Sequence, residues 1–249
     1  GVQWRVWFGG DVQGLVSDVP DIICLHSLKS QKVRDDSETV MNDIQITSFE
    51  SAKKLVQRGH AVPSDFWVFA GYAGWGPGQL MGELDRKSWY MVATDSQTLL
   101  KELARQSESA DPRDAGLDTW TLLMTMIGNK EKAEEYSGGF DDHMLKEWAY
   151  SNLMSKEDSR ENNSVNFQLK AFTSPAKEVR AGSILRASSG HRSPFLLRDQ
   201  EMHKSLVLII DENDDRTIGV ILNRPSSKCV EIQVIQGETG ESMKLPLRY

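Results

Sequence analysis

A run of five apolar residues at positions 66–70, Phe-Trp-Val-Phe-Ala, constrains the fold of this chain more than any other feature. The run has no helical period, and it stops at Gly71, where the backbone can turn freely. Apolar runs of this length without alternation are typical of strands that are covered on both faces. We therefore expect residues 66–70 to form a central strand.

Shorter apolar runs predict further strands, and apolar residues spaced by three and four predict helices. The strands are expected at residues 4–8, 22–25, 182–187, 205–210 and 217–222, with a weaker signal at 244–249 that Pro246 interrupts. The helices are expected at residues 49–58, 78–86, 96–106, 117–127 and 141–154, the first with Ser48 as its N-cap and Gly59 after its end. This mixture predicts an α+β fold.

The chain is long enough for one large domain or two small ones, because it has 249 residues. The charged stretch 156–164 lacks aromatic residues and is the best candidate for a linker. All seven tryptophans lie at or before position 148. We therefore expect two unlike regions, 1–155 and 181–249, joined by a linker at 156–180.

The charge and the cysteine count exclude several classes of function. A formal net charge of −7 argues against nucleic acid as a partner. No apolar run approaches the ~20 residues that span a bilayer, so we expect no membrane insertion. The first residues do not resemble a signal peptide. Two cysteines, Cys24 and Cys229, cannot build a disulfide framework, which favours a reducing compartment.

A glycine-rich segment at residues 71–78 follows the central strand and precedes a helix, as a phosphate-binding loop does. Its spacing matches neither the dinucleotide fingerprint nor the P-loop. Pro77 also removes one amide donor from the segment. We interpret it as a sharp turn between strand and helix that Tyr72 and Trp75 hold in place.

No other motif predicts a metal site or catalytic machinery. The acidic stretch 211–215 lacks the glycine and glutamate of a calcium loop, since Arg216 and Leu222 occupy those positions, and it is expected to be the tip of a hairpin. The five histidines do not have zinc-ligand spacing. Serines near His191 and His203 lack a nucleophile elbow, so His203 is expected to be structural. We assign no catalytic residue, no metal and no cofactor.

Motifs in both regions resemble those of one protein family. The first region contains Phe8, Gly9 and Gly10, then Cys24, Leu25 and His26, then the signature turn Gly71, Tyr72, Gly74, Trp75, Gly78 and Gln79, followed by Glu83 and Trp89. The second region contains Gly182, Leu185, Phe195, Gly219, Asn223, Arg224 and Pro225. These motifs resemble the AlgH/YqgE family, also called DUF179 or UPF0301.

The order of the motifs is reversed relative to the family. Residues 1–155 resemble the C-terminal half of an AlgH-like domain with a helical extension, and residues 181–249 resemble its N-terminal half. Tyr249 stands where a residue before Gly-Gly would stand, as Phe8 does. The chain therefore resembles one period of a tandem array or a permuted unit, in which the halves pair within one chain or between neighbours.

The resemblance implies a bulged, folded-over mixed β-sheet packed against helices. It implies no established activity, cofactor or catalytic residue. The extended helical region is similar to that of algal and plant members, which implies a plastid protein of the chloroplast stroma.

Two classes of function follow from these observations. The first is a non-enzymatic assembly module, a homo-oligomer or polymer that joins head to tail, for example in a shell or lattice around the carbon-fixing compartment of an alga. The second is a small-molecule-binding protein or enzyme, with a pocket near residues 71–78 that uses His26 and Glu83 together with Asn223 or Arg224. An interaction domain of a larger plastid protein is a third interpretation.

Overall fold

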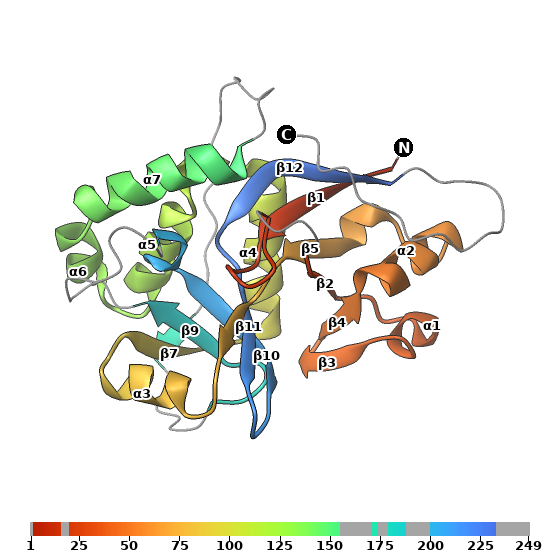
Figure 1. The fold of residues 1–249 in the computed structure, drawn as a ribbon, viewed down its shortest axis with the longest axis horizontal. Helices are drawn as coiled ribbons and strands as arrows, with labels where there is room; N and C mark the ends of the chain where they lie inside the picture. Colours follow the sequence, from red (N-terminus) through yellow and green to blue (C-terminus); the bar gives the residue numbers. More distant parts are fainter. Residues whose placement is uncertain (1, 16–19, 155–170, 174–178, 188–199, 233–249) are drawn as a thin grey trace.

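Two six-stranded sheets form the framework of the protein, and helices lie around them (Figure 1). The computed structural model describes residues 2–15, 20–154, 171–173, 179–187 and 200–232. The mixture of sheets and helices confirms the predicted α+β class and is consistent with an AlgH-like fold.

The first sheet has the strand order β12-β1-β5-β2-β4-β3. Its strands are β12 (Pro225–Ile232), β1 (Val2–Phe8), β5 (Phe66–Ala70), β2 (Ile22–His26), β4 (Ile44–Ser48) and β3 (Glu38–Met41). Only β1 and β5 run parallel to each other; all other neighbours are antiparallel. The predicted central strand 66–70 therefore lies inside this sheet.

The second sheet has the strand order β6-β11-β10-β9-β7-β8, with antiparallel neighbours throughout. Its strands are β6 (Ala73–Trp75), β11 (Thr217–Ile221), β10 (Leu206–Glu212), β9 (Ile184–Ala187), β7 (Trp89–Thr94) and β8 (Ala171–Thr173). The expected hairpin around residues 211–216 is confirmed by the pairing of β10 with β11.

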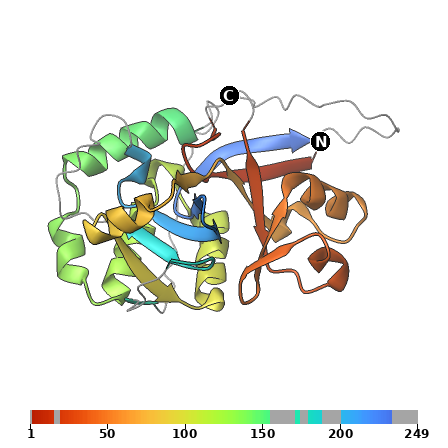
Figure 2. The same cartoon turned by 60° about the horizontal axis from the view of Figure 1, so that its bottom comes forward.

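The helices divide between the two sheets, as Figure 2 shows. They are α1 (Gln31–Arg34), α2 (Phe49–Gln57), α3 (Gln79–Asp85), α4 (Ser96–Ser109), α5 (Leu117–Met126), α6 (Lys130–Glu135) and α7 (Phe140–Leu153), with 3-10 turns η1 (Pro63–Asp65), η2 (Pro112–Asp114) and η3 (Gln200–Met202). Helix α2 packs on β2 and β4, α3 lies beside β7, and α7 contacts β12 and η3. No helix in the described ranges is both long and apolar enough to cross a bilayer.

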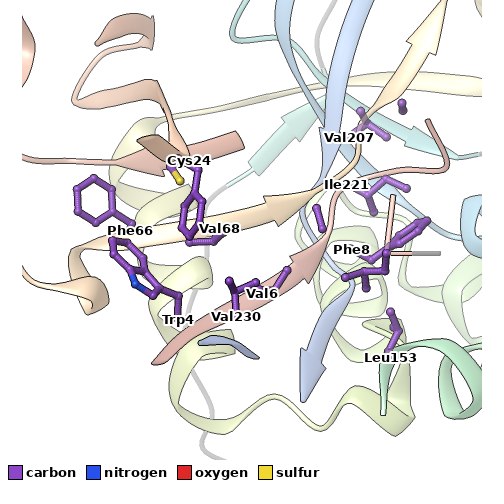
Figure 3. Close-up of a cluster of buried hydrophobic side chains, with 14 of the residues drawn as sticks. Trp4, Val6, Phe8, Cys24, Phe66, Val68, Leu153, Val207, Ile221 and Val230 are labelled. Atoms are coloured by element: carbon purple, nitrogen blue, oxygen red, sulfur yellow. The ribbon is translucent and has the colours of Figure 1, made fainter. Parts of the chain in front are cut away.

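The core explains why residues 66–70 lack alternation. Phe66 and Val68 point into a cluster with Trp4, which continues to Ile221 of the second sheet and Leu153 of α7 (Figure 3). Phe69 points to the opposite face, into a cluster with residues from α4 and the second sheet. Because both faces of β5 are buried, each of its positions has an apolar side chain.

The structure also corrects the sequence-based elements. Residues 71–78 were expected to form one turn between strand and helix. Instead, residues 73–75 form the strand β6 before α3 begins. The strands β3, β4, β6, β7, β8 and β12 and the helices α1 and α6 were not predicted, and β8 lies within the expected linker 156–180. The expected linker signal at 156–164, the strand at 244–249 and the residues around His191 lie outside the described residues.

Two connections carry the chain from one sheet to the other. Residues 71–72 link β5 of the first sheet to β6 of the second, and residues 222–224 link β11 of the second to β12 of the first. Both connections lie beside the end of β1, since the Ile221 N–H donates to the Gly9 carbonyl and the Gly9 N–H to the Ala70 carbonyl, at 2.8 and 2.9 Å. We call this place, where residues 71–72 and 222–224 pass the end of β1, the crossing; Gly9, Gly71, Tyr72, Asn223 and Arg224 of the family motifs lie there.

Candidate functional site

Glycines allow the two backbones at the crossing to touch. The Val12 and Tyr72 backbones exchange two hydrogen bonds of 3.1 Å each. A Cβ atom at Gly9, Gly10 or Gly71 would lie within 3.0 Å of backbone atoms of the facing segment, and Gly71 has φ +77°. A side chain at these positions would force the two segments apart, so the glycines are needed for a close approach of backbones.

Asn223 connects three buried backbone groups. Its Oδ1 accepts from the Leu206 N–H at 2.8 Å, and its Nδ2 donates to the carbonyls of Gly116 and Lys204 at 3.0 Å each. A backbone N–H can only donate and a carbonyl can only accept, which fixes the orientation of the amide. The side chain is fully buried. It ties the start of β10 to the start of α5.

Arg224 is a buried cation that backbone carbonyls surround. Its guanidinium donates to the carbonyls of Ala115 at 2.7 Å and Glu201 at 2.9 and 3.1 Å, and also to those of Asn223 and His203. Burial lowers the pKa of Arg224 to about 9, so the side chain is still charged at neutral pH. It holds η3 and the loop before α5 against the β11–β12 connection.

Glu83 holds two tryptophans in the second sheet. Its Oε2 accepts from the indole N–H of Trp75 at 3.0 Å and of Trp89 at 2.7 Å, and its Oε1 accepts from Gln79 at 3.0 Å. The two indole rings meet edge to face, with centroids 5.9 Å apart. The carboxylate therefore fixes α3 against β6 and β7.

His26 lies away from this crossing. It pairs with Phe66 at the start of β5, whereas Gly71 follows the end of that strand. Its Nδ1 accepts from the Leu28 N–H at 3.2 Å, and its Nε2 lies 2.9 Å from the Ser37 hydroxyl. Burial lowers the pKa of His26 to about 4, although Asp65 opposes this shift. The structure thus brings Asn223, Arg224 and the glycines together and places His26 elsewhere.

An ion-pair cluster that sequence reasoning did not identify joins α7 to β10. Asp142 accepts from Lys204 Nζ at 2.7 and 2.9 Å, and its Oδ1 lies 2.8 Å from His203 Nε2. Burial alone would raise the pKa of Asp142, but hydrogen bonds from His203, Lys204 and the Gly138 N–H lower it to about 2. The acidic residues 141–142 do open α7, as predicted, and the signal for the cluster was the adjacent cations at 203–204.

A small cavity of about 40 Å³ lies between α4, α5 and the second sheet. Its walls include Val92, Leu99 and Leu206, with Glu102 and Gln106 at one side. Glu102 accepts hydrogen bonds from Gln106 and Thr119. A cavity of this size holds about one water molecule, so it leaves no room for a substrate. In the described ranges, no three His, Cys, Asp or Glu side chains are grouped to hold a metal ion.

Comparisons with known proteins agree with the motifs of the first region. A family model described as AlgH-like matches residues 2–118. A UPF0301 protein of Thiobacillus denitrificans is 32% identical over 120 residues, covering 47% of this chain and 59% of the relative. UPF0301 proteins of Bordetella avium (30% over 122 residues, 47% and 55%) and Cupriavidus pinatubonensis (32% over 127 residues, 50% and 60%) match similarly.

The matched part spans little more than half the length of these relatives. No solved structure matches the chain. The family match ends at residue 118, so the resemblance of residues 182–225 rests on their motifs. Residues 2–118 are therefore similar to the AlgH-like, UPF0301 family, in agreement with the motifs of the first region.

Proposed function

We propose that this chain is a non-enzymatic structural module that self-associates by exchanging its two segments between copies. The observation that supports the proposal is the way the segments share their sheets. Strand β12 pairs with β1, β11 with β6, and β9 with β7, so each sheet contains strands from before residue 155 and from after residue 178. Neither segment has a complete sheet of its own.

The contacts between the segments do not depend on which copy supplies the partner. Strand pairing uses backbone hydrogen bonds, and Asn223 and Arg224 bind backbone carbonyls of residues 115–116 across the same junction. Exchange of an identical segment between copies keeps all these contacts, so its energetic cost is small. An exchange that runs head to tail gives a ring if it closes and a filament if it does not.

The reversed order of the family halves supports the same proposal, because one period of a tandem array would pair with its neighbours in this way. On this proposal the partners are further copies of the chain, with neither nucleic acid nor membrane involved. The plastid location and a lattice around the carbon-fixing compartment are part of the proposal and come from the resemblance to algal members.

The side-chain contacts weigh against the alternative of a small-molecule site at residues 71–78. Both carboxylate oxygens of Glu83 already accept hydrogen bonds, and Asn223 and Arg224 bind backbone groups. These polar groups hold elements of the fold together, which is a structural role.

A single substitution can test the exchange, because Arg5 of β1 lies directly opposite Cys229 of β12. The variant Arg5→Cys places two thiols across the junction between the segments. Cys24 will not interfere, since it is fully buried and burial raises the pKa of its thiol. Oxidation of the two thiols with added diamide forms one disulfide. Non-reducing gels show whether it lies within one chain or joins two chains, and light scattering measures the mass of the assembly.

We expect covalent dimers and larger species in Arg5→Cys, and oligomers of the unmodified protein at micromolar concentration. The double variant Arg5→Cys/Cys229→Ser is the control, because it keeps the new thiol and removes its partner. If the disulfide forms only within single chains and the unmodified protein is strictly monomeric, the proposal is wrong.

A further inference from the structure

A polar pocket of about 420 Å³ lies beside the edge strand β3, away from the crossing of the two sheets. Helix α1, strands β3 and β4, and the turn between these strands contribute its walls. The lining residues are Arg34, Ser37, Thr39, Asn42, Asp43 and Gln45. All six side chains are polar, and the volume lies in the range of small-molecule sites.

Gln45 provides the strongest sign that this pocket has a ligand. It lies on β4, next to the edge strand of the first sheet, between Thr39 of β3 and His26 of β2, and is only 6% exposed. Its Oε1 is buried and has no hydrogen-bond partner among the described residues. Buried polar atoms are almost always paired, so an unpaired acceptor on a residue that lines a polar pocket indicates a missing donor.

The network behind the pocket favours binding over catalysis. The Leu28 N–H donates to Nδ1 of His26, so the neutral ring carries its proton on Nε2 and donates it to the Ser37 hydroxyl. The Ser37 hydroxyl in turn donates to the Val33 carbonyl at 2.8 Å. His26 therefore cannot take a proton from Ser37 in this arrangement. It orients the hydroxyl and leaves the oxygen of Ser37 free to accept from a ligand.

The charges define the class of ligand. Arg34 is exposed, and no carboxylate in the described part of the chain pairs with it. Asp43 lies across the turn and is 3.7 Å from Lys29. The pocket thus offers a cation to an anionic group, and the oxygens of Gln45, Asp43 and Ser37 to hydrogen-bond donors.

We propose that this pocket binds a small hydroxylated anion, with its anionic group on Arg34 and its hydroxyl groups on Gln45 and Asp43. The side chains of Thr39 and Asn42 provide further donors and acceptors at the rim. The proposal concerns residues 34–45 only, and it is independent of whether the chain self-associates.

Three probes separate the parts of the proposed ligand: glycerol 3-phosphate, inorganic phosphate and glycerol. Binding can be followed by NMR through the side-chain amide signal of Gln45 and by calorimetry. We expect glycerol 3-phosphate to bind at least about tenfold more tightly than either phosphate or glycerol, because only it engages both ends of the pocket.

Two variants assign the contacts. Arg34→Gln is expected to weaken the binding of glycerol 3-phosphate and of phosphate by about tenfold or more, since it removes a charge-assisted hydrogen bond. Gln45→Met has nearly the same shape, and it should weaken glycerol 3-phosphate binding while leaving phosphate binding unchanged. Its melting temperature should not fall, because the substitution removes an unpaired buried oxygen.

The exposed Arg58 at the end of α2 provides the control, and Arg58→Gln should bind all three probes as the unmodified protein does. The absence of any binding of glycerol 3-phosphate at about 10 mM overturns the proposal. Equal affinity for glycerol 3-phosphate and phosphate also overturns it, and so does unchanged affinity in Arg34→Gln.

Discussion

Replacing Asn223 tests whether the signature residues hold the fold together. The Asn223→Ala variant leaves the Leu206 N–H and the carbonyls of Gly116 and Lys204 without their partner. Each net hydrogen bond contributes about 1 kcal/mol, and the cavity at this fully buried site adds about 1 kcal/mol. We therefore expect the free energy of unfolding to fall by about 4 kcal/mol, a large share of the stability of a typical protein.

The variant Asn223→Asp sharpens this prediction because it keeps the shape of the side chain. It retains an acceptor for the Leu206 N–H but turns a negative oxygen toward the carbonyls of Gly116 and Lys204, which lie 3.0 Å from the present Nδ2. A buried carboxylate facing two carbonyls costs at least as much as the alanine, about 4 kcal/mol or more. Burial also raises the folded-state pKa of the introduced carboxyl, so the loss should shrink as the pH falls and the group is protonated.

Urea unfolding followed by tryptophan fluorescence measures both variants at pH 7 and at pH 5. For a chain of this length, the alanine variant should melt about 12 °C lower than the unmodified protein. The reasoning is refuted if Asn223→Asp is more stable than Asn223→Ala at pH 7, because the two donor bonds to carbonyls would then be absent.

Three further predictions concern other buried groups. Asp142→Asn leaves the Lys204 ammonium without its counter-charge, so urea unfolding at pH 7 should show a loss of about 3 kcal/mol; an unchanged midpoint contradicts the ion pair. The pKa of His26 is lowered to about 4 in the folded protein, so on acidification the unfolded chain binds a proton at His26 at a higher pH than the folded protein does. The free energy of unfolding should therefore fall by about 2 kcal/mol as the pH drops from 6.5 to 4. His26→Gln should flatten that part of the pH profile, and an identical slope in the variant would assign the effect to another group. Val92→Ile adds one methyl group to a wall of the 40 Å³ cavity and should raise the melting temperature by an amount equivalent to about 1 kcal/mol, whereas a lower value would mean that the cavity is already filled.

The sequence predicts most of the strands that are buried on both faces. The apolar runs at β1, β2, β5, β10 and β11 have side chains in the core on both sides, so composition alone reveals them. Strands β3, β4 and β12 carry many polar residues, because they lie at or near the edges of the first sheet. Pro225 begins β12, a position that proline tolerates because β12 is an edge strand.

The candidate site is only partly visible in the sequence. The glycines and the Asn-Arg-Pro motif are recognisable in the sequence as turn residues. Their contacts, however, join residues more than 100 positions apart, such as Asn223 with Gly116. No local pattern encodes such a pairing. The pattern of apolar and polar residues also does not predict the role of Gln45. A glutamine in a strand gives no sign that its amide oxygen lies buried and unpaired.

The close contacts at the crossing explain why glycine and asparagine are placed where they are. Two connections pass from one sheet to the other beside the end of β1, and only backbones without a Cβ can approach so closely there. The Gly116 backbone, with φ +69°, lies so near the Asn223 carbonyl that a side chain at 116 would overlap it. The two segments of the chain therefore fit together atom against atom. A side chain introduced at residue 116 should displace the backbone of residue 223. The same close fit would be required of a partner segment from another copy, as the proposed exchange assumes.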